Sequence, residues 1–181
     1  MNEMNPVITP DYLKSAVRNI PDFPIKGVQF KDITTLLQDP ELFKFVIDET
    51  AAYYKNSGIT KIVAIESRGF ITGGAIAERL HAGFIPVRKP GKLPWKTYSK
   101  TYKLEYGEDT QEIHQDALNP DDVVLLHDDL LATGGTTLAA LDLISKFGVK
   151  KVFINYVIEL EFLNGRQKIG DKYDIFTLIK F

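Results

Sequence analysis

The stretch VVLLHDDLLATGGTTLA, residues 123–139, decides the fold class of this chain. Its four leading apolar residues, 123–126, are typical of a buried parallel strand. An acid pair, Asp128 and Asp129, follows, and then comes the small-residue loop 132–137. Beyond the loop, apolar residues at helical spacing predict an amphipathic helix with Gly148 as its C-cap: Leu138, Leu141, Ile144 and Phe147. The order strand, acid pair, loop and helix is that of one βα unit.

The loop of this unit has the composition of an anion site. Two adjacent glycines between threonines let successive backbone N–H groups and hydroxyls converge on one point, and the helix start adds partial positive charge there. We therefore predict a phosphate site made of Ala132, Thr133, Gly134, Gly135 and Thr136. The two aspartates upstream repel a phosphate, so they should face a neutral, hydroxyl-rich part of the same ligand. A ribose 5′-phosphate offers both groups.

Phosphate loops of other known kinds do not match this segment. A P-loop needs a lysine before its final Ser or Thr, and the dinucleotide fingerprint GxGxxG needs spaced glycines, whereas Gly134 and Gly135 are adjacent. The alternative interpretation is a βα unit whose glycines only make a tight turn and whose aspartates are solvated N-cap acids. The complete order of strand, acids, loop and helix favours the phosphate site.

The composition is that of one ordinary globular domain. The 181 residues are 44% hydrophobic and 25% charged, and no apolar segment is long enough to span a membrane. The N-terminus lacks the regions of a signal peptide, and the lack of cysteine excludes disulfides and thiolate chemistry. A formal net charge of −2 gives no global attraction to nucleic acid. We therefore expect a single soluble, cytoplasmic domain, 1–181, with neither a membrane nor a nucleic-acid partner.

Positive charge is concentrated in one segment despite the near-neutral total. Residues 88–103 carry six cations and no acid: Arg88, Lys89, Lys92, Lys96, Lys100 and Lys103. Two prolines and a glycine in the first half of this segment predict an exposed loop. A solvated basic loop is one interpretation. Because a phosphate site is predicted independently, we favour a loop that covers a second phosphate group of the ligand and excludes water.

The rest of the chain alternates between strands and helices. We predict helices over 39–55 and after 66–70, strands at 62–65, 84–87, 151–160 and 175–179, and a hairpin of 98–106 and 110–117 that turns at 107–109. Three βα units imply an α/β fold with a doubly wound, mostly parallel sheet flanked by helices, whose ligands bind beyond the carboxyl ends of the strands. Residues 66–68, 88–89 and 128–129 fall at such ends, so we expect them to meet.

With these segments in place, the chain resembles the adenine-specific branch of the type I phosphoribosyltransferase family along nearly its whole length. The resemblance is carried by DFPIKGVQFKDITTLL (22–37), ESRGF (66–70), RKPGKLP (88–94), YKLEYG (102–107), HDDLLATGGTT (127–137) and VIEL (157–160). It implies the fold of that family, with a small N-terminal hood at about 1–37 that contributes to the base site and a flexible loop and β-hairpin at about 89–117.

The resemblance also implies an activity, a cofactor and an assembly. The activity is transfer of ribose 5-phosphate from phosphoribosyl diphosphate (PRPP) to N9 of adenine, which gives AMP and diphosphate in purine salvage. Mg²⁺ is the implied cofactor, held mainly by the substrate and without a direct protein ligand. The implied assembly is a homodimer.

Position by position, the resemblance implies roles for the matching residues. The loop 132–136 would hold the 5′-phosphate, and the acid pair would hold the ribose hydroxyls. The diphosphate would be bound by Ser67, Arg68, Arg88, Lys89, Lys92 and Tyr106. Adenine would be bound by Gln29, Phe30, Lys31 and Leu160, with Phe30 stacked on the purine and the backbone at 29 and 31 reading its edge. Glu105 would be the catalytic residue that transfers the purine proton.

Two departures from the family and two alternative functions remain. The smaller departure is Lys31, which stands where the family often has arginine. His127 stands where an aliphatic residue is common, and we predict that it points into the core with a satisfied ring nitrogen. His81 and His114 are predicted on the surface, and the three histidines lack metal-ligand spacing. Specificity for a 6-oxopurine is one alternative, and it would be expected to show a lysine near 157–160. A non-catalytic DNA-binding regulator is the other, and it would need a winged or helix-turn-helix domain.

Overall fold

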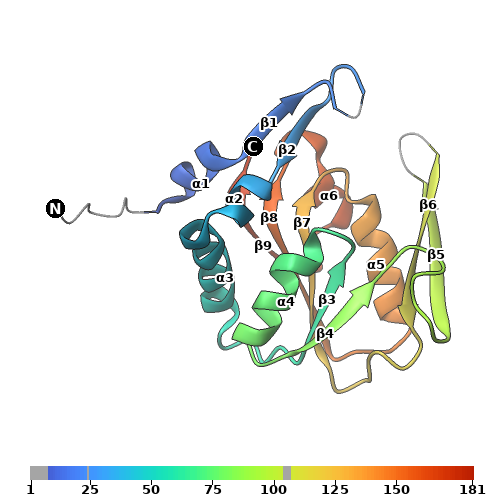
Figure 1. Ribbon diagram of the computed structural model, residues 1–181. Coiled ribbons are helices and arrows are strands. Elements are labelled where there is room, and N and C mark those ends of the chain that lie inside the picture. The colour runs from blue at the N-terminus through green and yellow to red at the C-terminus, as the bar shows by residue number, and fades with distance from the viewer. Residues whose placement is uncertain (1–7, 24, 104–106) are drawn as a thin grey trace. The chain divides into compact units, whose positions relative to one another are not determined.

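The computed structural model describes residues 8–23, 25–103 and 107–181, and the chain divides into two compact units, 1–46 and 47–181 (Figure 1). The described elements of the first unit are α1 Pro10–Ala16, β1 Arg18–Pro21, β2 Gln29–Asp32 and α2 Thr34–Gln38. Thr9 caps α1, because its hydroxyl oxygen accepts a hydrogen bond of 3.2 Å from the Tyr12 N–H. The strands β1 and β2 form an antiparallel hairpin. The role of residues 1–37 as a hood at the base site stays a prediction.

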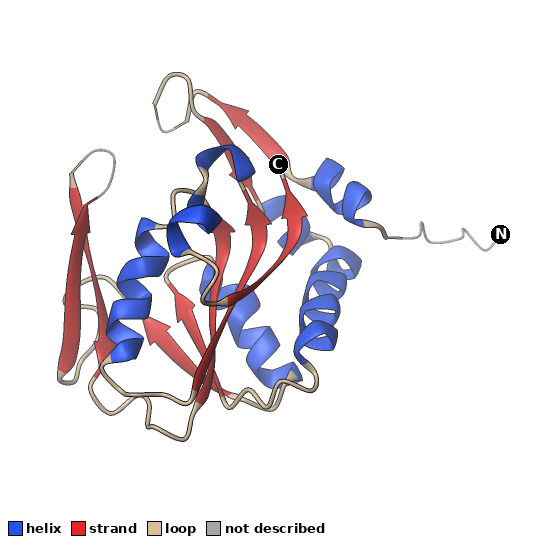
Figure 2. Ribbon diagram, turned by 180° about the vertical axis from the view of Figure 1, so that it is seen from behind, coloured by secondary structure: helices blue, strands red, loops and turns tan. Residues whose placement is uncertain are grey.

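The second unit is built on a five-stranded parallel sheet in the order β4-β3-β7-β8-β9. Its strands are β3 Lys61–Ile65, β4 Gly83–Val87, β7 Val123–Leu131, β8 Lys151–Glu159 and β9 Asp174–Lys180. The helices α4, Gly69–Arg79, and α5, Gly135–Ser145, cover opposite faces of this sheet (Figures 1 and 2). The predicted doubly wound α/β fold is therefore confirmed.

Alternation of side chains along the strands explains how both faces of the sheet are buried. In β3, Val63 and Ile65 belong to the same core cluster as Leu143 of α5. Ala64 points to the other face, where it lies against Gly73 of α4. Because helices cover both faces, the strands have the continuous apolar runs from which they were predicted.

The remaining described elements are two helices, a hairpin and a 3₁₀ helix. They are α3 Pro40–Tyr54, which runs from the first unit into the second, the hairpin β5 Thr97–Lys103 and β6 Glu108–His114, the short 3₁₀ helix η1 Glu161–Leu163 and α6 Gly165–Ile169. Reciprocal backbone hydrogen bonds of 3.0 and 2.7 Å between Arg88 and Glu112 tie the hairpin to the end of β4. Within the described ranges, no helix combines the length and apolarity needed to cross a membrane.

The structure corrects three predicted boundaries. The strand β7 continues past residue 126 to Leu131, because His127 and Asp128 stay paired with β8, so the acid pair lies inside the strand. The hairpin turns before Glu108, which is paired with Lys103, and β6 ends at His114, not at 117. The C-cap of α5 is Lys146, and Gly148 lies two residues beyond it. The other predicted strands and the helix 39–55 agree with the structure to within one residue at each end.

The prediction for His127 is confirmed. Its side chain is fully buried, with Nε2 2.7 Å from the Thr72 hydroxyl oxygen of α4 and Nδ1 2.7 Å from Oδ1 of Asn155 in β8. Because that amide oxygen can only accept, Nδ1 carries the proton and Nε2 accepts from Thr72. His81 is exposed as predicted, whereas His114 is half-buried and its Nε2 is buried, which corrects its placement on the surface.

His127 should make the fold less stable as the pH falls. Burial lowers its pKa from 6.5 to about 4, although the hydrogen bond with Asn155 opposes this change. Between these two pH values the unfolded chain binds more protons than the folded chain, so the free energy of unfolding falls with decreasing pH, by ~3 kcal/mol at most from this residue. Urea unfolding at several pH values, on the unchanged chain and on His127→Leu, measures this contribution. Parallel pH profiles for the two proteins would contradict it.

Candidate active site

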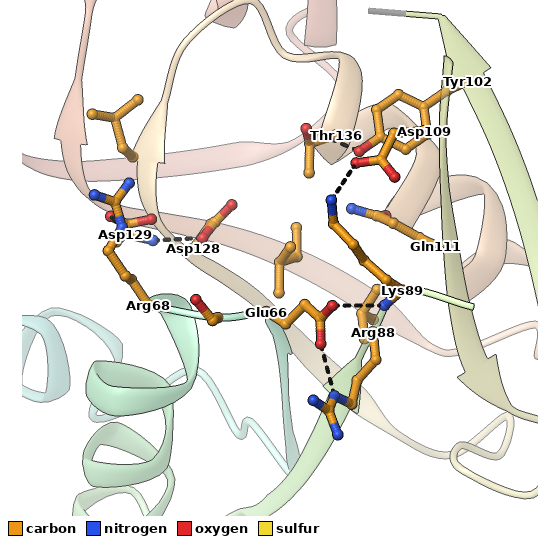
Figure 3. Close-up of a pocket in the computed structure, with 14 residues that line it drawn as sticks. Glu66, Arg68, Arg88, Lys89, Tyr102, Asp109, Gln111, Asp128, Asp129 and Thr136 are labelled. Atoms are coloured by element: carbon orange, nitrogen blue, oxygen red, sulfur yellow. Dashed lines mark hydrogen bonds and ion pairs between the residues drawn. The ribbon is translucent and has the colours of Figure 1, made fainter. Parts of the chain in front are cut away.

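A cavity of about 320 Å³ lies at the carboxyl ends of β3, β4 and β7 (Figure 3). The residues predicted at these three strand ends line the cavity, together with residues of the hairpin and of the start of α5. The predicted site residues among them are Ser67, Arg68, Arg88, Lys89, Asp128, Asp129 and Thr136. The expectation that the strand ends meet is therefore confirmed, because neighbouring parallel strands deliver their carboxyl ends to one edge of the sheet.

The predicted phosphate loop joins β7 to α5. Gly134 has a φ of 78°, the left-handed conformation that glycine adopts without strain, and α5 begins at the next residue. Thr136 lines the cavity, and its hydroxyl oxygen accepts a hydrogen bond of 3.4 Å from the Tyr102 hydroxyl of the hairpin. The N–H groups of the first helical turn have no partners within the helix, which gives the loop its capacity to bind an anion.

The acid pair lies beside this loop. The backbone N–H of Asp129 donates a hydrogen bond of 2.8 Å to Oδ1 of Asp128, and Arg68 Nε lies 2.8 Å from Oδ2 of Asp129. Burial raises the pKa of both carboxyls, and the charge of Asp129 raises that of Asp128 further, whereas Arg68 opposes the rise at Asp129. A Cβ at Gly69 would stand 2.9 Å from Oδ1 of Asp128, so α4 can begin this close to the pair only with glycine.

Three of the predicted diphosphate cations, Arg68, Arg88 and Lys89, each pair with a carboxylate of the chain itself (Figure 3). Besides the pair of Arg68 and Asp129, Arg88 Nε donates to Oε2 of Glu66 at 2.7 Å and the Lys89 N–H donates to Oε1 at 3.0 Å. Lys89 Nζ lies 3.3 Å from Oδ2 of Asp109. Although burial opposes ionisation of Glu66, the hydrogen bonds from Arg88 and Lys89 lower its pKa. The cavity therefore combines three cations with carboxylates that hold them in place.

Other predicted residues do not line this cavity. Lys92 is exposed, and its backbone oxygen accepts a hydrogen bond of 3.3 Å from the Arg88 side chain. Leu160 is buried, and its N–H donates to the Leu131 oxygen at 2.9 Å. Glu105 and Tyr106 lie outside the described residues.

The predicted adenine residues Gln29, Phe30 and Lys31 form part of β2 in the first unit. There the Gln29 side-chain oxygen accepts a hydrogen bond of 2.7 Å from Asn19. The ring of Phe30 lies edge-on to that of Phe23, with centroids 5.1 Å apart.

Sequence reasoning placed Glu66 at a strand end but gave it no role, and it missed three further polar residues that line the cavity: Tyr102, Asp109 and Gln111. Asp109 and Gln111 share a strand face with Ile113, which is fully buried. This period-two pattern was a usable signal, but placing the turn at 107–109 hid Asp109. Glu66 stands within the segment ESRGF, where an acid beside cations signals an ion pair.

The fold and cavity are those of a phosphoribosyltransferase. The family model for the phosphoribosyl transferase domain matches residues 32–179. Among curated relatives, the adenine phosphoribosyltransferase of Phocaeicola vulgatus is 54% identical over 92% of this chain and 96% of its own length. That of Citrifermentans bemidjiense is 56% identical over 93% and 98%. The chain therefore belongs to the adenine phosphoribosyltransferase family.

Solved structures give the same result. The crystal structure of the Giardia lamblia enzyme complexed with 9-deazaadenine superposes with a TM-score of 0.92 at 45% identity, over 97% of this chain and 99% of that one. The adenine phosphoribosyltransferase of Rhodothermus marinus has a TM-score of 0.90 at 47% identity, over 95% and 98%.

Proposed function

We propose that this protein transfers the 5-phosphoribosyl group of PRPP to N9 of adenine, giving AMP and diphosphate in purine salvage. The observation that carries the proposal is one cavity lined by Thr136 of the predicted phosphate loop, by the acid pair and by three cations, at the ends of neighbouring parallel strands. These groups match the 5′-phosphate, the ribose diol and the diphosphate in order. A Trypanosoma brucei relative, 26% identical, has been crystallised with AMP, pyrophosphate and ribose-5-phosphate.

The charges of the cavity would decide the orientation of PRPP, with its phosphate groups toward N–H groups and cations and its ribose toward the acid pair. The loop 132–136 would bind the 5′-phosphate through backbone N–H groups, and Asp128 and Asp129 would accept hydrogen bonds from the ribose hydroxyls. Ser67, Arg68, Arg88, Lys89, Lys92 and Tyr106 would bind the diphosphate. Gln29, Phe30, Lys31 and Leu160 would bind adenine. Diphosphate oxygens would compete with Glu66 for Arg88 and with Asp109 for Lys89. Binding of PRPP would therefore replace these two ion pairs with contacts to the diphosphate.

Replacing Gly134 with valine should weaken PRPP binding strongly. Its φ of 78° is rarely adopted by β-branched residues, and a Cβ there would stand 2.9 Å from the carbonyl oxygen of Gly165. The loop would therefore move, and we expect the KM for PRPP to rise about 100-fold or more with the fold retained. Steady-state kinetics and circular dichroism would measure both. Unchanged binding of PRPP and AMP by folded Gly134→Val would place the phosphate elsewhere.

The reaction breaks the bond between C1′ and the diphosphate oxygen and forms the bond between C1′ and N9. Positive charge develops on the ribose ring and negative charge on the departing diphosphate. Arg68, Arg88 and Lys89 would stabilise the negative charge, and the acid pair would lie near the positive ring. Glu105 would accept the proton that N9 loses. A closed loop over the cavity would keep water from the activated ribose.

We propose Mg²⁺ as the cofactor. The donor chemistry of the cavity suits it, because the carboxylate oxygens of Asp128 and Asp109 line the space where the diphosphate would lie. Substrate oxygens and water would hold the ion, and these carboxylates would accept hydrogen bonds from its waters. When bound, the ion would neutralise charge on the diphosphate.

The assembly and location proposed with this activity are a cytoplasmic homodimer. Arg88 is the residue with which to test the assembly, because it stands at the end of β4, where the hairpin is tied on, and its guanidinium is half exposed.

Replacing Arg88 with alanine should raise the KM for PRPP by about 10- to 100-fold, because a diphosphate contact is lost and Glu66 keeps a negative charge in the cavity. Co-expression of Arg88→Ala with Glu105→Gln, followed by purification of the mixed dimer, would locate the contact. Restored activity in the mixed dimer would show that Arg88 serves the partner's site. Activity no higher than that of either parent would confine Arg88 to its own chain.

The direct test of the proposed function is release of diphosphate from PRPP, with and without adenine and Mg²⁺. Release that depends on adenine, with AMP formed in equal amount, is expected. Release without any purine would mean hydrolysis and would contradict the proposal.

A further inference from the structure

An ion pair between a buried carboxylate and a partly exposed arginine lies behind the phosphate loop. Glu159, the last residue of β8, is only 2% exposed, and a buried carboxylate is costly unless it is paired. Arg166 of α6 pairs with it through two nitrogens: Nε donates to Oε1 at 2.9 Å and a terminal nitrogen donates to Oε2 at 2.6 Å. Although burial opposes ionisation, the hydrogen bonds from Arg166 and Thr177 lower the pKa of Glu159.

The same arginine also bonds α6 to β9, the edge strand of the sheet. Its two terminal nitrogens also donate to the Ile175 backbone oxygen and to the Thr177 hydroxyl oxygen of β9, both at 3.0 Å. Arg166 therefore joins α6 to β8 and β9 at once. A lysine carries the same charge but lacks the planar set of donors that this arrangement uses.

Gly165, the residue before Arg166, packs its main chain directly against the main chain of the phosphate loop. A Cβ at Gly165 would overlap the carbonyl group of Ala132 and stand 2.9 Å from a methyl carbon of Leu131. A Cβ at Gly134 would stand 2.9 Å from the Gly165 oxygen. The two main chains thus touch at a point where each one must be glycine.

We infer that Gly165 and Arg166 are positioning residues that set the geometry of the 5′-phosphate loop from behind. The inference rests on the proposed function. The loop would bind its phosphate with backbone N–H groups, which cannot turn independently as side chains do, so the place of the main chain decides the affinity. Arg166 holds α6 on the sheet, and Gly165 transmits that position to residues 132–134.

Two small ligands separate this role from a general effect on the fold. Ribose 5-phosphate carries the group that the loop would bind, whereas diphosphate with Mg²⁺ uses the strand ends and not the loop. We expect Gly165→Ala to weaken binding of ribose 5-phosphate by about 10- to 100-fold in titration calorimetry and to leave diphosphate binding within about threefold. Gly74→Ala is the matched control, because a Cβ on that helical glycine meets nothing within 4 Å, and it should bind both ligands normally.

A second variant keeps the inference testable if Gly165→Ala does not fold. Arg166→Lys keeps the charge and should produce the same selective loss of ribose 5-phosphate binding. Normal binding of ribose 5-phosphate by either folded variant would overturn the inference, as would an equal loss of both ligands. If the unchanged chain bound diphosphate with Mg²⁺ but not ribose 5-phosphate, the loop would not be a phosphate site, and the inference would fall with that part of the proposed function.

Discussion

Adenine should be used at least about 10⁴-fold more efficiently than hypoxanthine or guanine, as measured by kcat/KM. A site that reads the purine edge through one backbone donor and one backbone acceptor, which we propose at residues 29 and 31, would fit adenine at N1 and the 6-amino group. A 6-oxopurine reverses that pattern. Buried backbone groups would then be left without partners, which costs far more than a poor apolar fit.

Diphosphate release from PRPP with each purine in turn measures this specificity. Phe30→Ala serves as the companion variant, and loss of stacking and burial should weaken adenine binding by ~1–3 kcal/mol without changing the order of the purines. A conservative control is Phe30→Tyr, which keeps the aromatic face. Comparable turnover of hypoxanthine would overturn the adenine specificity and leave the phosphoribosyl transfer standing.

Replacing Glu105 with glutamine should lower kcat by roughly 10²–10³ and leave the KM for PRPP nearly unchanged. The substitution keeps the size of the side chain but removes the base that would accept the N9 proton. The loss should therefore appear in the chemical step and not in binding. Single-turnover measurements would separate chemistry from product release.

Two comparisons sharpen the test of Glu105. Glu112→Gln, on the same hairpin, removes a carboxylate that does not line the cavity and should leave kcat nearly unchanged. Glu105→Asp keeps the base but shortens its reach, so part of the activity should remain. A near-normal kcat for Glu105→Gln would assign the proton to water or to another group.

Much of the fold followed from local pattern. The apolar run at 123–126, the helix spacing from Leu138 and the buried runs of β3, β4, β8 and β9 each identify an element, because side-chain period depends only on the local backbone. The strand boundaries that failed share one cause. Asp128 and Asp129 resemble the end of a strand in sequence, but pairing with β8 keeps them within β7. Strand length is decided by the neighbouring strand as well as by the residues themselves.

The candidate site likewise has features that local sequence predicts and features that it does not. The chemistry of the loop 132–136, of the acid pair and of the cations at 68 and 88–89 is local, since it needs only short stretches of chain at strand ends. The partners of the cations are not local. Glu66 holds Arg88 across 22 positions, and Asp109 reaches Lys89 from a hairpin whose register no short motif specifies.

By itself, the sequence determined the βα units, the glycines of the predicted phosphate loop and the kinds of groups that a ribose phosphate would meet. Only the tertiary structure decided which carboxylate neutralises which cation, and that Gly165 and Arg166, some 30 residues after the loop, support it from behind. Local elements depend on backbone sterics and periodicity within a few residues, whereas these contacts depend on strand order and crossovers, which bring together residues far apart in the chain.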